Sequence, residues 1–111
     1  MDILEHFLHI ISQDEFVEGH EVLEVLWHQY KKIPEKEAEA KILKGLINGS
    51  TALALAVKKK YEGANRVWET FEKYAVLIPL TNSPYTSLYQ QAETALRQKH
   101  AIYMKNVEIS R

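Results

Sequence analysis

The stretch of residues 42–57 most constrains the fold, because apolar residues lie on most sides of the helix that it predicts. A helix with apolar groups nearly all round has to be covered by other elements, as in the middle of a bundle. Gly45 and Gly49 lie four residues apart on one face of it, where they allow a neighbouring helix to come close. We expect that neighbour to present Gly19. The sequence therefore predicts a central, buried helix with others packed around it.

Further helices are predicted around the central one, from apolar residues that recur at helical spacing. Turn-forming and capping residues separate these patterns. The predicted helices cover residues 2–11, 14–31, 34–60 (which includes the central stretch), 64–77 and a last helix that opens at Ser83 and Pro84. Gly63 is the predicted stop between the third helix and the fourth. We therefore expect an all-α fold, a compact single-domain bundle of about five helices.

One domain is all that 111 residues comfortably form, and we expect it to span residues 1–111, with its core in residues 2–105 and a frayed C-terminal tail. The lack of cysteine excludes disulfides and thiolate metal sites. The 14 basic and 15 acidic residues leave no positive excess of the kind that nucleic-acid binding needs. No apolar run approaches the roughly 18 residues of a membrane helix, and residues 1–5 lack the basic start of a signal peptide. We therefore expect a cytoplasmic protein with no nucleic-acid partner and no membrane partner.

The segment EGHEVLEVLWHQY, residues 18–30, brings several chemically capable side chains onto one predicted helix. At about 100° per residue, His20, Glu24 and Trp27 share a narrow strip, with Glu21 on its flank. A histidine and a glutamate four residues apart can bind one metal ion, because side chains at that spacing lie one above the other. The candidate metal set is therefore His20, Glu21 and Glu24, which could hold a divalent metal, while the cofactor itself stays unknown.

The pentapeptide HEVLE is close to the zincin motif H-E-x-x-H, except that Glu24 stands in place of the second histidine. One nitrogen ligand and one oxygen ligand favour manganese or iron over zinc. The chain offers no second E-x-x-H motif. The other helices carry glutamates that we expect to be exposed, namely Glu37, Glu39, Glu69 and Glu72. A metal site closed within one chain would therefore lack ligands.

Two further interpretations of the same residues stay open. In the first, His20 and Glu24 are catalytic, because an unperturbed histidine titrates near neutrality and an adjacent carboxylate can orient it for proton transfer. Trp27, Lys44 and Asn48 would then bind a small-molecule substrate whose identity the sequence does not give. In the second, the His20–Glu24 pair is structural and packs against Lys44 or Asn48 to fix the register of two helices. Whether the protein is an enzyme is therefore open.

A family pattern is recognisable in two motifs: H-E-x-L-E-x-x-W at residues 20–27, and L-x-G-L-I at residues 43–47, with Gly63-Ala64 after them. Over residues 16–77 the chain resembles the DUF309 family of small bacterial and archaeal helical proteins. The resemblance implies a compact all-α fold and brings no established activity. The signature residues that it carries over are His20, Glu21, Glu24, Trp27 and Gly45.

Two positions depart from the family pattern: Lys44 stands where a glutamine is usual, and Asn48 replaces a second glutamine with a shorter amide. If Lys44 meets Glu24, the resulting ion pair counts against a metal. On the second helix, on the side opposite Glu24, Val22 and Val25 could form the contact of a homodimer. We therefore expect a His/Glu cluster at the seam of the second and third helices that is structural or part of an interaction module. The alternative is a metal-dependent or acid/base enzyme of hydrolase type.

Overall fold

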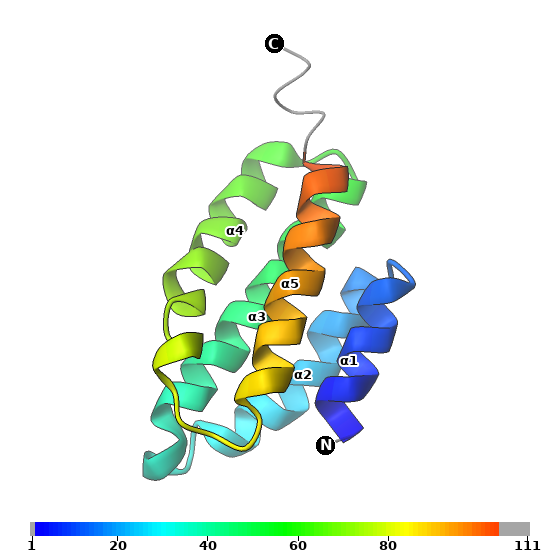
Figure 1. Ribbon diagram of the computed structural model, residues 1–111. Helices are drawn as coiled ribbons and strands as arrows, with labels where there is room; N and C mark the ends of the chain where they lie inside the picture. Colours follow the sequence, from blue (N-terminus) through cyan, green and yellow to red (C-terminus); the bar gives the residue numbers. More distant parts are fainter. Residues whose placement is uncertain (1, 105–111) are drawn as a thin grey trace.

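The computed structural model describes residues 2–104 as a bundle of α-helices (Figure 1). The elements are α1 (Asp2–Ser12), α2 (Phe16–Tyr30), the 3-10 turn η1 (Pro34–Lys36), α3 (Glu37–Val57), α4 (Tyr61–Ala75), the 3-10 turn η2 (Ile78–Leu80) and α5 (Thr86–Tyr103). No strand occurs within residues 2–104, so the predicted all-α bundle of about five helices is confirmed. The predicted end of the core at residue 105 and the frayed tail lie outside the described residues.

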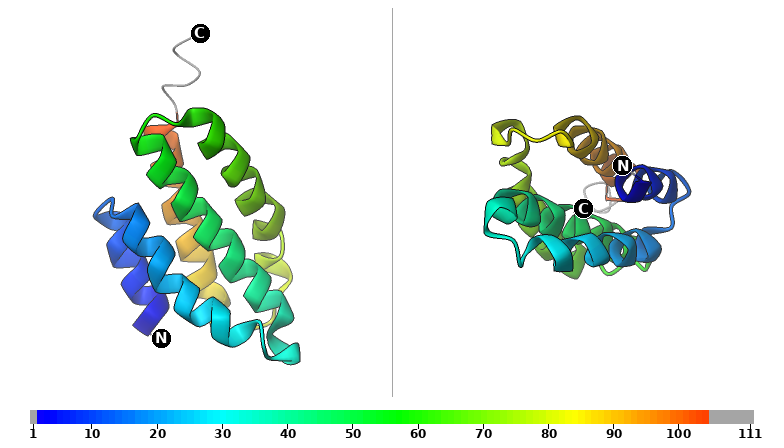
Figure 2. Two further views of the ribbon diagram at one scale, coloured as in Figure 1. Left: turned by 180° about the vertical axis from the view of Figure 1, so that it is seen from behind. Right: turned by 90° about the horizontal axis from the view of Figure 1, so that it is seen from below.

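Helix α3 lies at the centre of the bundle. It packs against α2, α4 and α5, while α1 covers α2 and α5. Figure 2 shows α2, α3 and α4 side by side on one face, with α5 behind them. Twelve of the 21 residues of α3 are buried, far more than in any other described helix. The prediction of a central buried helix is therefore confirmed.

The helical stretch Pro34–Val57 is long and apolar enough to cross a membrane when length and composition alone are considered. In the bundle, 61% of its apolar window is buried. The central helix of a globular bundle needs the same composition, because it meets other helices on most sides. Packing therefore accounts for the apolar residues of α3, and the absence of a membrane partner stays a prediction.

The core is built from large apolar side chains of all five helices. The fully covered ones include Leu4, Phe7, Leu23, Leu43, Leu46, Leu53, Phe71, Tyr89 and Leu96. Burying one such side chain contributes about 1.5–3 kcal/mol to the free energy of folding. Because α3 packs against three other helices, its buried side chains meet core residues of α2, α4 and α5.

The two glycines of α3 do not face α2, contrary to the prediction. A methyl group built on Gly45 would lie 2.8 Å from Cβ of Tyr74 in α4. One built on Gly49 would lie 2.9 Å from Cδ1 of Leu96 in α5. The strip of small residues therefore lets α4 and α5 approach α3, while Gly19 of α2 meets other groups. The error arose because a glycine strip indicates close packing without indicating which helix comes close.

Gly19 lies where α1, α2 and α3 meet. A methyl group there would be 2.8 Å from Oγ of Ser50 in α3 and 3.0 Å from Cδ1 of Ile11 in α1. The buried Ser50 hydroxyl donates a hydrogen bond to the backbone carbonyl of Phe16, at 2.5 Å. The predicted close contact at Gly19 is therefore present, and a polar bond between α2 and α3 lies beside it.

The predicted helix stop at Gly63 is wrong, because α4 begins at Tyr61 and contains that glycine. The chain reverses instead at Lys59, whose φ of 61° lies in the left-handed region. The amide of Lys60 donates to the carbonyl of Leu55 at 2.9 Å, which is the bonding pattern of a Schellman cap. A lysine therefore takes the position that glycine usually occupies. The other helix ends differ from the predicted ones by about three residues or fewer, a usual margin.

Candidate functional site

Two rows of side chains line the seam between α2 and α3, which run in opposite directions (Figure 2). One row is His20, Glu24 and Trp27 of α2 with Lys31 directly after its last residue, and the row on α3 is Glu37, Lys41, Lys44 and Asn48. Both rows have the spacing i, i+4, i+7, i+11, which keeps side chains on one side of a helix. Because the helices are antiparallel, the His20 end of one row lies beside the Asn48 end of the other. We call the surface between the rows the trough.

The upper hollow of the trough has a volume of about 190 Å³ and is lined by His20, Glu24, Trp27, Lys44, Ile47 and Asn48. Nε2 of His20 lies 2.5 Å from Oε1 of Glu24, and the two side chains are 35% and 37% exposed. Nε2 of His28 lies 3.9 Å from the other oxygen of Glu24. The carboxylate therefore sits between two imidazoles, at a surface that water reaches. The residues predicted to be catalytic or substrate-binding thus line one hollow.

The polar residues of α3 in this hollow do not bond to the His20–Glu24 pair. The side-chain amide of Asn48 donates to the backbone carbonyl of Lys44, at 2.7 Å. No ion pair joins Lys44 to Glu24 within the described residues. The expected contact of the pair with Lys44 or Asn48 is therefore not formed. Oε1 of Glu24 already has a partner on α2, Nε2 of His20 one helical turn earlier, while Oε2 lies 3.9 Å from Nε2 of His28, which is beyond hydrogen-bond distance.

Among residues 2–104, no group of three or more His, Asp or Glu side chains gathers closely enough to hold a metal ion. Glu21 is exposed and does not line the hollow, although His20 and Glu24 do. The predicted metal set of His20, Glu21 and Glu24 therefore stays a prediction from the sequence. The two residues that the structure brings together offer one nitrogen and two oxygens.

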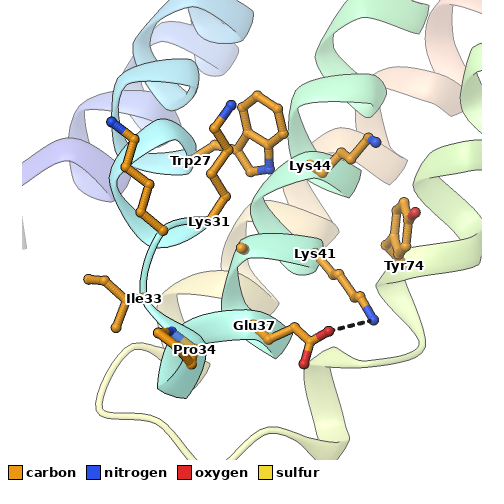
Figure 3. A pocket seen from close by; sticks show the side chains of 10 residues that line it. Trp27, Lys31, Ile33, Pro34, Glu37, Lys41, Lys44 and Tyr74 are labelled. Atoms are coloured by element: carbon orange, nitrogen blue, oxygen red, sulfur yellow. Dashed lines mark ion pairs between the residues drawn. The ribbon is translucent and has the colours of Figure 1, made fainter.

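Beyond Trp27 the trough opens into a second, larger space of about 510 Å³, which we call the lysine hollow (Figure 3). Its lining consists of Trp27, Lys31, Lys32, Ile33, Pro34, Glu37, Ala40, Lys41, Lys44 and Tyr74. Trp27 and Lys44 also line the upper hollow, so the two spaces adjoin. The lysine hollow therefore extends over the exposed side of α3, from the end of α2 to Tyr74 of α4.

Positive charge dominates the lysine hollow. It holds four of the 14 basic residues of the chain and one of the 15 acidic residues. Nζ of Lys41 lies 3.6 Å from Oε1 of Glu37, and Nζ of Lys31 lies 4.4 Å from the centre of the Trp27 ring. A cation over an indole face is attracted by the ring. Of these four lysines, Lys44 was the one predicted to lie at a site. Lys41 is one turn away on the same helix, whereas Lys31 and Lys32 join them only through the fold.

Glu39 is the polar residue that sequence reasoning placed wrongly, since it is buried (8% exposed) and was predicted to be exposed. Its Oε1 accepts hydrogen bonds from the hydroxyls of Tyr89 and Ser83, each at 2.7 Å, and Nζ of Lys36 donates to Oε2 at 3.3 Å. Burial alone would raise the pKa of Glu39, but the bonds from Tyr89 and Ser83 and the charge of Lys36 outweigh it and lower the pKa. One signal was available: Glu39 precedes the buried Leu46 by seven residues and so shares its face.

The Glu39 network ties the start of α3 to the start of α5. Tyr89 is fully buried, and burial together with its bond to Glu39 raises the pKa of its hydroxyl. Each donor already has its acceptor, since no buried side-chain nitrogen or oxygen among the described residues lacks a hydrogen-bond partner. The network therefore holds the start of α3 against the start of α5.

Comparison with known proteins gives one finding. A family model described as a domain of unknown function, DUF309, matches residues 4–67. No curated protein and no solved structure matches the chain. The matched residues cover α1, α2 and α3 with part of α4, so the match starts earlier than the resemblance at residues 16–77 did. It includes both rows of the trough, although Tyr74 lies beyond it.

Proposed function

The chain belongs to the DUF309 family, and we propose that it is a protein-interaction module that binds a segment of a partner protein in the trough. The family description names no activity, so the proposal rests on the geometry of this surface. In it, the His20–Glu24 pair shapes the upper end of the trough and has no part in a reaction. The partner lies across the seam between α2 and α3.

The observation that carries the proposal is the position of Trp27. Its indole lines both hollows of the trough, so it lies at the middle of the surface. Trp68, the other tryptophan, is only 7% exposed and stacks on His100, whereas Trp27 is partly exposed. Tryptophan is strongly enriched among the few residues that carry most of the binding energy of an interface, usually near its centre. A half-exposed indole flanked by two hollows matches that description.

The dimensions of the trough suit a short extended segment. The first and last residues of each row are eleven helical steps apart, which corresponds to about 16 Å along a helix. An extended chain advances about 3.3 Å per residue, so about five residues would lie along the trough. Carbon surface from Ile33, Pro34 and Ala40 borders the space, so apolar side chains of the segment would find contacts beside Trp27.

Acid/base catalysis by His20 and Glu24 is a second candidate, because the upper hollow gives solvent access to both side chains. The lining of that hollow supplies no hydroxyl or thiol nucleophile. A dyad about one-third exposed to water also gains little of the electrostatic preorganisation on which enzymes rely. The geometry therefore supports binding more than turnover.

A peptide-display selection with the intact protein as bait tests the interaction module. We expect the selection to enrich peptides from a random library. Their binding should be lost with the Trp27→Ala protein and kept with the Val25→Ala protein. Val25 is the matched control, since it is 57% exposed on the same helix and lies outside the trough. Failure to enrich any peptide over an empty display, or equal binding to the Trp27→Ala protein, would refute the proposal.

The second candidate has its own test with a panel of activated esters and phosphate esters. Under the interaction proposal, His20→Gln and wild-type protein give the same background rate of hydrolysis. Turnover that depends on His20 would replace the proposal by the enzyme. Both His20→Ala and Glu24→Ala should lower stability by less than about 1 kcal/mol, because exposed pairs at i, i+4 contribute about 0.3–0.5 kcal/mol.

A homodimer through Val22 and Val25 stays a further proposal, as do a cytoplasmic location and the absence of a nucleic-acid partner. Val25 is exposed and Val22 is half-buried, so the two offer a small apolar area on the outer side of α2. That side faces away from the trough, so a dimer would leave the trough free. Sedimentation equilibrium of wild type and Val25→Glu decides it: a dimer that the glutamate disrupts supports this contact, and a wild-type monomer excludes it.

A further inference from the structure

We infer that the segment bound in the trough is acidic, with its carboxylates in the lysine hollow and an apolar side chain on Trp27. This inference rests on the proposed interaction module and adds the chemistry of its ligand. It starts from the uneven distribution of charge. The chain as a whole has a net charge of −1, yet the lysine hollow holds four lysines and a single glutamate.

Within residues 2–104, three of these lysines have no acidic partner. Of the four, Lys41 alone has a carboxylate from this part of the chain within ion-pair distance, that of Glu37. In the described part of the chain, no carboxylate lies that close to Lys31, Lys32 or Lys44. Their ammonium groups are therefore available to an anion that enters the hollow. Exposed ion pairs are individually weak, so several of them are needed for a useful gain in affinity.

The helix dipole explains only half of the positive charge. Lys31 and Lys32 follow the C-terminal end of α2, where cations are favoured in any protein. Lys41 and Lys44 lie beyond the first turn of α3, where the helix dipole has little effect on either sign of charge. The lysines of α3 therefore have no such local reason to be there. Together with those of α2, they place positive charge along both sides of the trough.

The kind of charge favours several carboxylates over one compact phosphate. The hollow contains no arginine, the residue that grips phosphate with two parallel hydrogen bonds. Lysine is a point charge on a flexible stem, so four of them can meet separate carboxylates along a segment. The apolar surface of Ile33 and Ala40 between them suits the carbon atoms of glutamate side chains and an apolar neighbour.

The test compares two short labelled peptides by fluorescence anisotropy with the full chain. One has a central leucine flanked by glutamates, and the other has glutamines in place of the glutamates. We expect the acidic peptide to bind at least about tenfold more tightly at about 0.05 M salt, where charges are weakly screened. The advantage should largely disappear at about 0.5 M salt.

Two double variants that remove the same charge at different places show which lysines bind the acidic peptide. The double variant Lys31→Gln/Lys44→Gln should weaken the acidic peptide about three- to tenfold, since exposed ion pairs add small amounts each. The control Lys58→Gln/Lys60→Gln removes the same charge at the opposite end of α3 and should change the affinity less than about twofold. None of these four lysines has an ion-pair partner among the described residues, but Nζ of Lys31 lies over the Trp27 ring. Urea midpoints equal to that of wild type are therefore required of both double variants before their affinities are compared.

Equal affinity for both peptides, no binding of the acidic peptide, or equal weakening by the two double variants would each overturn the inference. Tighter binding of a single-stranded oligonucleotide through Lys31 and Lys44 would overturn it in favour of nucleic acid. Failure here is distinct from failure of the interaction module. Peptides selected through Trp27 that carry no acidic residues would leave the module intact and remove only the acidic ligand.

Discussion

Replacing Glu39 is the sharpest test of how the start of α3 is held against α5. A buried carboxylate with three hydrogen-bond donors has no counterpart elsewhere in the described chain. The hydroxyls of Tyr89 and Ser83 both donate to it at 2.7 Å. Hydrogen bonds to a charged group contribute about 1.5–3 kcal/mol each, and an unpaired buried donor costs about 1–3 kcal/mol. Removal of one member of a buried charged group costs about 3–5 kcal/mol. We therefore expect Glu39→Ala to lose about 3–5 kcal/mol and Glu39→Gln somewhat less.

Urea denaturation at neutral pH measures these losses, and Glu37→Gln serves as the control. Glu37 lies on the same helical turn as Glu39 but is exposed, so its substitution should stay within about 0.5 kcal/mol of wild type. A double-mutant cycle of Glu39→Gln with Tyr89→Phe should give a coupling of about 1–3 kcal/mol, as residues in one hydrogen-bond network do. A Glu39→Gln protein as stable as wild type, or a coupling near zero, would refute the account of this network.

The pH dependence of the stability of Glu39→Gln, compared with wild type, tests the same network independently. The pKa of Glu39 is lowered in the folded protein from an ordinary value of 4.5. A lowered carboxyl pKa stabilises the fold above the ordinary value, and the stabilisation is lost as the pH falls through the folded-state pKa. The stability difference between wild type and Glu39→Gln should therefore be constant above about pH 5 and shrink below about pH 4. A difference that grows on acidification would contradict the assignment.

Further predictions concern helix packing and one surface pair. Gly49→Ala should lose about 1–3 kcal/mol, because the new methyl group would lie 2.9 Å from Cδ1 of Leu96. Gly63→Ala, with its nearest neighbour at 3.6 Å, should instead gain up to about 1 kcal/mol from helix propensity. The two midpoints in urea should move in opposite directions, and a shared direction would refute the packing at Gly49. Arg97→Lys should cost about 0.5–1 kcal/mol, because the guanidinium donates two hydrogen bonds to Glu72, at 2.7 and 3.0 Å, that lysine cannot reproduce; an unchanged thermal midpoint would contradict this.

Helix positions and the central place of α3 could be predicted from the sequence, because both depend on local periodicity. A stretch that is apolar on most sides can only be covered by neighbours, whichever they are. The choice of neighbour could not be predicted. Gly45 and Gly49 indicated a close approach, but the identity of the approaching helix depends on the paths of α4 and α5. Likewise Lys59 ends α3 in a conformation that sequence reasoning assigned to Gly63, since glycine adopts it at lower cost.

The candidate site, too, could be predicted from the sequence only in part. His20, Glu24 and Trp27 are neighbours on one helix, so their shared strip followed from helical geometry, and Lys44 and Asn48 join them across the seam. The lysine hollow could not be predicted, although most of its lining residues lie within residues 27–44, because only the antiparallel packing of α2 on α3 and the approach of Tyr74 from α4 bring them around one space. Glu39 was missed for a related reason, as its partners Ser83 and Tyr89 lie more than forty residues away.

The docking of a partner segment over Trp27 is tested most directly by a proton–nitrogen NMR titration of the full chain with a selected peptide. We predict that the indole signal of Trp27 shifts, together with the amides of Glu24 and Lys44. The indole of Trp68, buried at the α4/α5 seam, should stay unchanged. Shifts confined to the groove between α1 and α5, lined in part by Gln91 and Gln98, with Trp27 unmoved, would contradict the account.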